Sequence, residues 1–367
     1  MNDGLYLDAN ATEPLRPEAR AAVLAALDLR GNPSSVHADG RAARRVLETA
    51  RSQIAGAFGA RAQDVVLTAG GTEANAAAIH ALAPGRVVLV GATEHPAVLA
   101  ATPGTTPIPV LADGRLDLAA LDTLLARSEA ALVCVMAANN ETGVLHPLSE
   151  IATLCRRHGA LLHIDAVQAA GRMALDFAAL GADTMALSGH KLGGPKGAGA
   201  LLLRPGLTLA PLLAGGGQER GRRGGTEALP AIAGMGAAAV AARPEDAARL
   251  ARLRDAIEAG AGLAVAGQGA PRLPNTTSLI FPRMPAETLV IALDLEGVRV
   301  SAGSACSSGK VTRSHVLTAM GLGEAAGHAI RVSLPWDAPE DAAPRFLAAL
   351  ARIGARLAPV AGPSTGG

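Results

Sequence analysis

Lysine is almost absent from this chain. Of 33 basic residues, only Lys191, Lys196 and Lys310 are lysines, and the other thirty are arginines. Arginine keeps its proton under ordinary conditions, whereas lysine can lose it and then act as a nucleophile or form a Schiff base. Each lysine is therefore a candidate for a chemical role. The plain alternative is codon bias with lysines left on surface loops.

Aromatic residues, excess charge and long apolar runs are also scarce. Aromatics make up 2% of the sequence, which argues against the base-stacking surfaces of single-strand binding proteins. A net charge of +1 offers no electrostatic footprint for nucleic acid or an anionic membrane. No apolar run approaches the length that spans a bilayer, and the first residues lack the pattern of a signal peptide. We therefore expect a cytoplasmic protein with no membrane partner and no direct nucleic-acid partner.

Cysteine is the third scarce residue. Cys134, Cys155 and Cys306 show neither metal-ligand spacing nor a disulfide framework, so we predict no metal site and a reducing setting. Cys134 and Cys155 lie in apolar segments and are expected to be buried. Cys306 lies in a run of small polar residues with Lys310 nearby, which indicates an accessible thiol that ionises readily. The alternative for Cys306 is a surplus surface thiol.

The composition and the apolar pattern predict an α/β enzyme. Hydrophobic residues make up 49% of the 367-residue chain and charged residues 18%, which is typical of a globular protein with one large and one smaller domain. Short apolar runs alternate with helical segments, which favours a mostly parallel sheet covered on both faces. The expected strands are residues 65–68, 86–90, 108–111, 131–136, 161–164, 184–187 and 198–203. A helical connector over 230–258, with Pro244 as a candidate break, then leads to a smaller α+β region.

Asp165 and Lys191 each follow one of these strands. The carboxyl ends of parallel strands meet at one edge of a sheet, so we expect the two side chains to share that edge. A pyridoxal phosphate (PLP) enzyme needs a carboxylate beside its Schiff-base lysine to pair with the ring nitrogen. An aspartate in this position often merely caps the next helix, and that alternative stays open.

Other polar residues are expected at the same edge. Gly70, Gly71 and Thr72 come after a strand and open a helix, which is a weak signal for a phosphate site. His95 begins another helix and could lie over a cofactor ring, and Asn140 follows the strand 131–136. Ordinary loop capping is the plain alternative for both.

Taken together, these segments resemble the cysteine desulfurases of the NifS/IscS type, in the class V aminotransferase group of PLP-dependent enzymes. The resemblance covers nearly the whole chain. Its motifs occur in the family's order at compatible spacings: residues 31–37 (GNPSSVH), 93–95 (TEH), 139–143 (NNETG), 163–168 (HIDAVQ), 188–191 (SGHK), 221–226 (GRRGGT) and 303–306 (GSAC).

The resemblance implies roles for individual residues. Lys191 matches the lysine that binds PLP covalently and later moves the substrate Cα proton, and Cys306 matches the nucleophile that receives sulfur. Asn140 and Arg331 match the clamp for the substrate carboxylate, a bidentate task that suits arginine. The matches to cofactor-binding residues are Asp165 for the ring nitrogen, Gln168 for the ring hydroxyl, His95 stacked on the ring, Gly71, Thr72, Ser188 and His190 at the phosphate, and Thr226 at the phosphate across a dimer interface.

The resemblance also implies fold, reaction and partners. The fold is that of the fold type I PLP-dependent transferases, with a large PLP-binding domain over residues 13–235 and a small domain over 1–12 and 236–360 that carries Cys306. Residues 361–367 are expected to form a disordered tail. The implied reaction converts L-cysteine to L-alanine and transfers the sulfur, as a persulfide on Cys306, to an acceptor protein for iron–sulfur cluster, thio-cofactor or tRNA biosynthesis. The implied assembly is a homodimer.

Alternatives within and outside this class stay open. A selenocysteine lyase or another class V enzyme would use the same cofactor site, and a non-catalytic scaffold of the same fold would use none of it. The chain also departs from the family pattern at Pro335 and Trp336, where relatives commonly have glycine and a polar or basic residue, and at Ala9. These departures concern the shape of the substrate pocket and the choice of partner.

Overall fold

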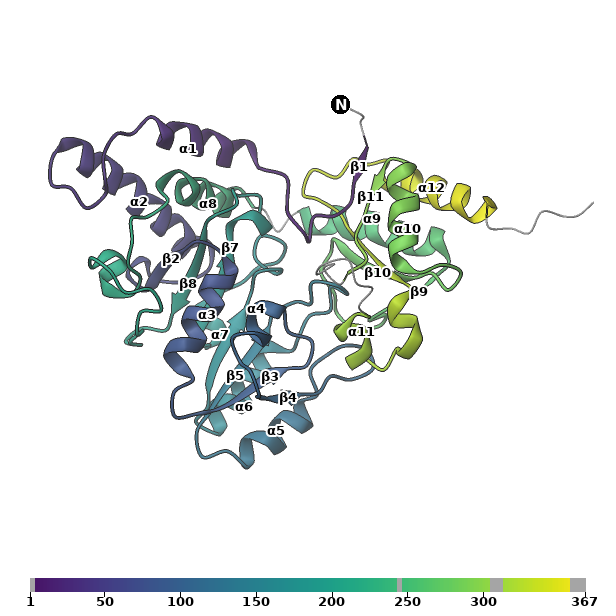
Figure 1. The fold of residues 1–367 in the computed structure, drawn as a ribbon, viewed down its shortest axis with the longest axis horizontal. Helices are drawn as coiled ribbons and strands as arrows, with labels where there is room; N and C mark the ends of the chain where they lie inside the picture. The colour runs from purple at the N-terminus through teal and green to yellow at the C-terminus, as the bar shows by residue number, and fades with distance from the viewer. Residues whose placement is uncertain (1–3, 243–245, 304–312, 357–367) are drawn as a thin grey trace, which may run out of the picture.

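The structure is a computed structural model of the chain, and it describes residues 4–242, 246–303 and 313–356. The predicted α/β architecture is confirmed (Figure 1). The strands are β1 (Leu5–Tyr6), β2 (Val65–Thr68), β3 (Val87–Gly91), β4 (Thr106–Ile108), β5 (Ala131–Met136), β6 (Leu161–Asp165), β7 (Thr184–Ser188), β8 (Gly199–Leu203), β9 (Ala264–Val265), β10 (Thr276–Ile280), β11 (Val298–Arg299) and β12 (Ala329–Ser333).

Helices cover the sheets and connect their strands. The helices are α1 (Pro17–Leu27), α2 (Ala38–Ala57), α3 (Gly71–Leu82), α4 (Pro96–Leu99), α5 (Leu118–Ala126), α6 (Leu148–Arg157), α7 (Phe177–Leu180), α8 (Leu229–Ala241), α9 (Asp246–Ala261), α10 (Ala286–Leu295), α11 (His315–Ala319) and α12 (Ala342–Arg356). In the described part of the chain, no helix is both long and apolar enough to cross a membrane.

A seven-stranded sheet forms the larger half of the molecule, in the order β2-β8-β7-β6-β5-β3-β4. The pairs from β7 through β6, β5 and β3 to β4 are parallel, and β8 pairs antiparallel with both of its neighbours. Side chains alternate between the two faces of each strand. In β2, Val65 and Leu67 therefore pack with α2 and α8, whereas Val66 packs with α3 on the opposite face.

A second core lies in the C-terminal half and includes the first residues of the chain. It joins β1, β10 and β12 to α9, α10 and α12, with Phe346 fully buried at its centre. β1 pairs in parallel with β11, almost three hundred residues later, and Figure 1 shows this N-terminal strand beside the C-terminal elements. We propose the division into residues 13–235 and residues 1–12 with 236–360, and the end of α8, at Ala238 and Ala239, still packs in the core of the large sheet.

Local predictions differ from the structure mainly where the chain turns. The predicted strand over residues 108–111 is instead β4, which ends at Ile108. Residues after Pro109 turn back on themselves, because Val110 bridges Leu116 and the Leu111 N–H donates to Arg115 O at 2.8 Å. The helical connector is two helices: α8 ends at Ala241, and α9 begins at Asp246. β9, α7 and α11 were not predicted, since each is five residues or shorter.

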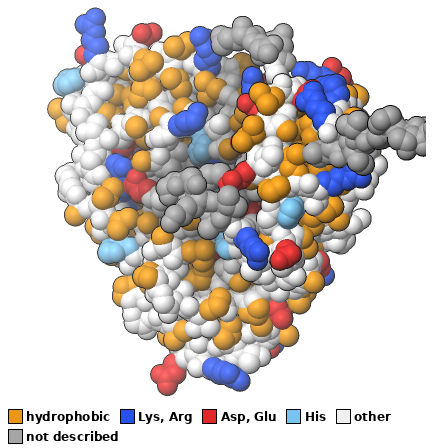
Figure 2. All heavy atoms as spheres, turned by 45° about the vertical axis from the view of Figure 1, so that its right-hand side comes forward, with side chains coloured by type: hydrophobic (Ala, Val, Ile, Leu, Met, Phe, Trp, Pro, Cys, Tyr) orange, Lys and Arg blue, Asp and Glu red, His pale blue; other side chains and the backbone are white. Residues whose placement is uncertain are grey.

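The surface matches the balanced composition. On the face drawn in Figure 2, basic and acidic side chains are scattered among apolar ones over both halves of the molecule. Cys134 and Cys155 are buried, as predicted.

Candidate active site

A cavity of about 770 Å³ opens at the carboxyl ends of β6 and β7 and at the N-terminus of α3. This is the edge of the sheet at which the sequence predicts the functional residues. Nine of the predicted residues line the cavity: Gly71, Thr72, His95, Asn140, Asp165, Gln168, Ser188, His190 and Lys191. Lys196, the second of the three lysines, lines it too.

Lys191 lies just after β7, with its amine against backbone oxygens. The Nζ atom donates to Asn10 O at 2.5 Å and to Ala11 O at 3.0 Å. Burial lowers the pKa of Lys191 to about 7, and the positive charges of Arg172 and Arg331 act in the same direction. A large share of this amine is therefore unprotonated near neutral pH, which is the state a nucleophile or base requires.

Asp165 is the last residue of β6 and is buried beneath the cavity. Its Oδ1 accepts from the Val167 N–H at 2.9 Å, and its Oδ2 accepts from Asn75 Nδ2 at 2.8 Å. Burial raises the pKa of Asp165, whereas these two hydrogen bonds lower it. A cationic group in the cavity would favour the ionised carboxylate.

Asn75, on α3, extends this contact into the protein, and no sequence pattern indicated this role. Its Oδ1 lies 2.9 Å from His163 Nε2, and His163 Nδ1 lies 2.8 Å from Thr184 Oγ1. Because the Asn75 amide nitrogen donates to Asp165, its oxygen must accept, so His163 carries its proton on Nε2. Burial lowers the pKa of His163 to about 3, which keeps the ring neutral. Each group in this chain of hydrogen bonds therefore donates to the next: Thr184 to His163, His163 to Asn75, and Asn75 to Asp165.

The N-terminus of α3 faces the same cavity. A Cβ added at Gly71 would lie 2.6 Å from Val167 Cγ2 and 3.3 Å from Ser188 Cβ, so this close approach requires glycine. Free N–H groups at a helix N-terminus, with the hydroxyls of Thr72 and Ser188 beside them, suit a phosphate. Burial lowers the pKa of His190 to about 4, so its neutral ring can donate or accept there.

His95 is the N-cap of α4 and lines the cavity. Its Nδ1 accepts from the Ala97 N–H at 3.1 Å, so the proton of the neutral ring is on Nε2. Burial lowers the pKa of His95, while the nearby charge of Asp165 raises it.

Arg331, on β12, reaches the cavity's edge from the second core. Its Nη1 donates to Asn140 O at 3.1 Å, and its Nη2 donates to Asp8 Oδ1 at 2.7 Å. Its Nε is buried and has no partner among the described residues. The guanidinium thus lies next to Asn140 with donor capacity to spare.

Two predicted residues lie elsewhere. Thr226 is exposed and does not line the cavity. Cys306 lies outside the described residues. The described residues on either side of its segment meet at Glu141, which follows Asn140: the Ser314 hydroxyl donates to Glu141 Oε2 at 2.6 Å, and a Cβ at Gly303 would lie 3.0 Å from that oxygen. Among the residues that the structure describes, no cluster could hold a metal ion.

The fold and the site define a PLP-dependent enzyme of the α/β class, and the chain belongs to the class-V aminotransferase family, whose model matches residues 5–343. It is 45% identical to a cysteine desulfurase of Cereibacter sphaeroides over 350 residues, which cover 90% of each chain. It is 43% identical to a cysteine desulfurase of Rhodobacter capsulatus over 378 residues, 97% of this chain and 98% of the other. A solved NifS-like protein from Rickettsia africae ESF-5 superposes with a TM-score of 0.89, at 34% identity, over 96% of this chain and 99% of that one.

The residues present fit the cofactor of this family. A buried carboxylate, Asp165, suits a protonated ring nitrogen, and the N-terminus of α3 suits a phosphate. Lys191 has the lowered pKa that Schiff-base formation needs.

Proposed function

We propose that this chain is a cysteine desulfurase that converts L-cysteine to L-alanine and passes the sulfur, as a persulfide on Cys306, to an acceptor protein. The observation that carries the proposal is the convergence of Lys191 and Asp165 in one cavity whose edge also holds Arg331. Glu141, beside that edge, contacts Ser314 and lies close to Gly303, the described neighbours of the segment that carries Cys306.

Each side chain has a task that its surroundings support. Asp165 would pair with the ring nitrogen of PLP, His95 would lie against the ring, and Gln168 would donate to the ring hydroxyl. Gly71, Thr72, Ser188 and His190, at the N-terminus of α3, would hold the phosphate. Arg331 and Asn140 would bind the substrate carboxylate, for which the buried, unpartnered Nε of Arg331 provides a donor.

PLP, when bound, supplies an electron sink that acidifies the substrate Cα–H and weakens the Cβ–S bond. Lys191 Nζ takes the Cα proton in its unprotonated state, and its lowered pKa makes that state available near neutral pH. The carbonyl oxygens of Asn10 and Ala11 accept hydrogen bonds from the amine and so orient it.

The Cys306 thiolate then attacks the substrate sulfur. An S–S bond forms, the Cβ–S bond breaks, and its electron pair stays with the carbon fragment, which gains protons and leaves as alanine. The sulfur remains on Cys306 as a persulfide, which is a reversible modification of the thiol. No outside oxidant is needed, because the substrate carbon is reduced as the two sulfurs join.

The proposal also covers the oligomeric state, the sulfur acceptor and the cellular compartment. We infer a homodimer. The family resemblance assigns Thr226 to the phosphate, but Thr226 does not line the cavity of its own chain, so it would contact the phosphate in the site of a second copy. The sulfur acceptor is a protein of iron–sulfur cluster, thio-cofactor or tRNA biosynthesis. A reducing cytoplasm suits an enzyme that depends on a free thiolate.

Replacement of Cys306 tests this function. Purified protein should take up PLP and turn yellow, and it should release alanine and sulfide from cysteine in the presence of a thiol reductant. Cys306→Ala should abolish sulfur transfer while the bound cofactor and its spectrum persist. Cys155→Ala is the matched control, because that thiol is buried on α6. Full activity in Cys306→Ala would show that another group receives the sulfur.

A further inference from the structure

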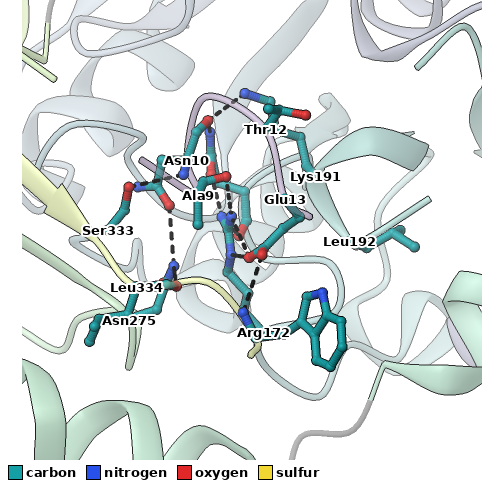
Figure 3. Close-up of polar contacts among 12 residues, drawn as sticks. Ala9, Asn10, Thr12, Glu13, Arg172, Lys191, Leu192, Asn275, Ser333 and Leu334 are labelled. Carbon is teal, nitrogen blue, oxygen red and sulfur yellow. Dashed lines mark hydrogen bonds and ion pairs between the residues drawn. The ribbon is translucent and has the colours of Figure 1, made fainter. Parts of the chain in front are cut away.

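Arg172 is a buried guanidinium beside the cavity, and the reaction proposed above gives it no task. Its side chain is 3% exposed. Its Nη1 donates to Gln168 O at 3.0 Å and also to Gln168 Oε1. Its Nη2 donates to Ala9 O at 3.1 Å and to Glu13 Oε1 at 3.2 Å. Figure 3 shows the Arg172 side chain facing Glu13 and Ala9. A planar guanidinium held by several fixed acceptors is a rigid donor.

This guanidinium decides how the amide of Gln168 is oriented. Arginine offers only donors, so the amide oxygen of Gln168 must face it. The amide nitrogen then faces the other way and donates to Asn10 O at 3.0 Å. Gln168 also lines the cavity, and one N–H of its amide is left over after the bond to Asn10. An amide without Arg172 could turn its oxygen toward the cavity and offer an acceptor there.

Glu13 holds Arg172 in place from the other side. Its side chain is 5% exposed, and its Oε2 accepts from the Trp336 N–H at 3.2 Å. The indole Nε1–H of Trp336 donates to Pro14 O at 2.9 Å, and Arg16 stacks on the ring at 4.8 Å from its centroid. Trp336 stands where the sequence departs from the family pattern. The carboxylate is therefore fixed by both halves of the molecule.

The same segment supports the lysine loop. The Glu13 N–H donates to His190 O at 2.9 Å, and the Arg16 N–H donates to Gly193 O at 2.8 Å. Lys191, between these two contacts, donates to Asn10 O, the carbonyl that also accepts from Gln168. One backbone oxygen thus joins the two side chains that face the cofactor site.

We propose that Arg172, held by Glu13, is a positioning residue that keeps the amide nitrogen of Gln168 turned toward the cavity, where it donates to the ring oxygen of PLP. The inference rests on the proposed function and extends it to two residues that do not line the cavity. Arg172 acts through Gln168, so its effect on the cofactor requires that side chain.

A double-mutant cycle tests this on the holoenzyme. The variants are Arg172→Lys, Gln168→Ala and their combination. Arg172→Lys keeps the positive charge but loses the fork that reaches both Gln168 and Glu13. The readout is the pH midpoint of the visible absorption band of the bound cofactor. When the donor to the ring oxygen is lost, the ionised form of that oxygen becomes less stable. Each single variant should therefore raise the pH midpoint by about one pH unit.

The combination should shift the midpoint no further than Gln168→Ala alone, because a residue that acts through another shows no additional effect once that other is gone. The charges that act on the neighbouring Lys191 come from Arg172, Arg331, Asp8 and Asp165. Arg172→Lys changes none of their signs. A shift that persists undiminished in the Gln168→Ala background, or no shift in Arg172→Lys, overturns the proposal.

Binding of PLP to the cofactor-free chain provides a second measurement. Arg172→Lys and Gln168→Ala should each raise the dissociation constant by about tenfold, and their combination should raise it no further. The matched control is Arg51→Lys, which alters another buried bidentate arginine–glutamate pair, with Glu219, outside the cavity lining. It should leave both readouts unchanged. A wild-type chain that binds no PLP would overturn the proposed function together with this inference, whereas one that binds PLP without desulfurating cysteine would refute the function alone.

Discussion

The buried amine of Lys191 should destabilise the cofactor-free chain in a pH-dependent way. Burial lowers the pKa of Lys191 from 10.5 to about 7. Between those two values the unfolded chain binds more protons than the folded one, so the free energy of unfolding rises with pH in that window. A difference of about 3.5 pKa units corresponds to roughly 5 kcal/mol between the low-pH and high-pH limits.

Lys191→Met removes the titrating group and keeps the length of the side chain. The variant also loses two hydrogen bonds to carbonyl oxygens, but that loss is the same at every pH. Relative to Lys191→Met, the wild-type chain should therefore gain about 2 kcal/mol of stability between pH 7 and pH 9. Below pH 7 both states are protonated, and the difference should level off.

Equilibrium urea unfolding of the two cofactor-free chains measures this difference. Each chain is unfolded at pH 7, 8 and 9, and the difference in free energy of unfolding is plotted against pH. The matched control is Lys196→Met, which removes an exposed lysine from the same loop. A flat line for Lys191→Met would show that the amine keeps an ordinary pKa and that burial does not prepare it for chemistry.

Two further predictions concern Asp165 and the second core. Asn75→Ala removes a donor to the Asp165 carboxylate and should weaken PLP binding by about tenfold in a titration of the cofactor-free chain, with Thr184→Val, at the far end of the same hydrogen-bond chain, giving a smaller loss. An unchanged dissociation constant in Asn75→Ala would mean that Asp165 needs no support from α3. Phe346→Ala should lower the free energy of unfolding by about 3–5 kcal/mol, because the ring is fully buried between α12 and its neighbours. Leu295→Ala, at an 82% exposed position, should change it by less than about 0.5 kcal/mol, and a similar small change in Phe346→Ala would contradict the packing of that core.

Much of the larger half could be predicted from local pattern alone. The bounds of β2 and β5 agree with the sequence because each is a continuous apolar run between clear turns. A strand of two residues, such as β9, carries too little pattern to be located. Its existence depends on the partner strand, β10, which lies elsewhere in the chain.

Some residues of the candidate site could likewise be identified from the sequence, and others could not. Asp165 and Lys191 could be identified because each ends or follows a recognisable strand, and parallel strands bring such ends together. Asn75, Glu13 and Arg172 could not, because their importance comes from hydrogen bonds to segments far away in the sequence. Arg172 and Glu13 are separated by 159 positions, and Asn75 and Asp165 by 90. The one available signal was the alternation of His163 with Asp165 along β6, which places both side chains on one face.

Short-range periodicity and residue type are enough to predict the order of strands and helices, the residues at the strand ends and the family resemblance. The charge and orientation of those residues depend on how the chain folds around them. The lowered pKa of Lys191 comes from burial and from charges contributed by distant segments. The orientation of Gln168 comes from Arg172, and that of Arg172 from Glu13 and Trp336. Desolvation and hydrogen-bond geometry are properties of the folded neighbourhood, so no reading of adjacent residues could supply them.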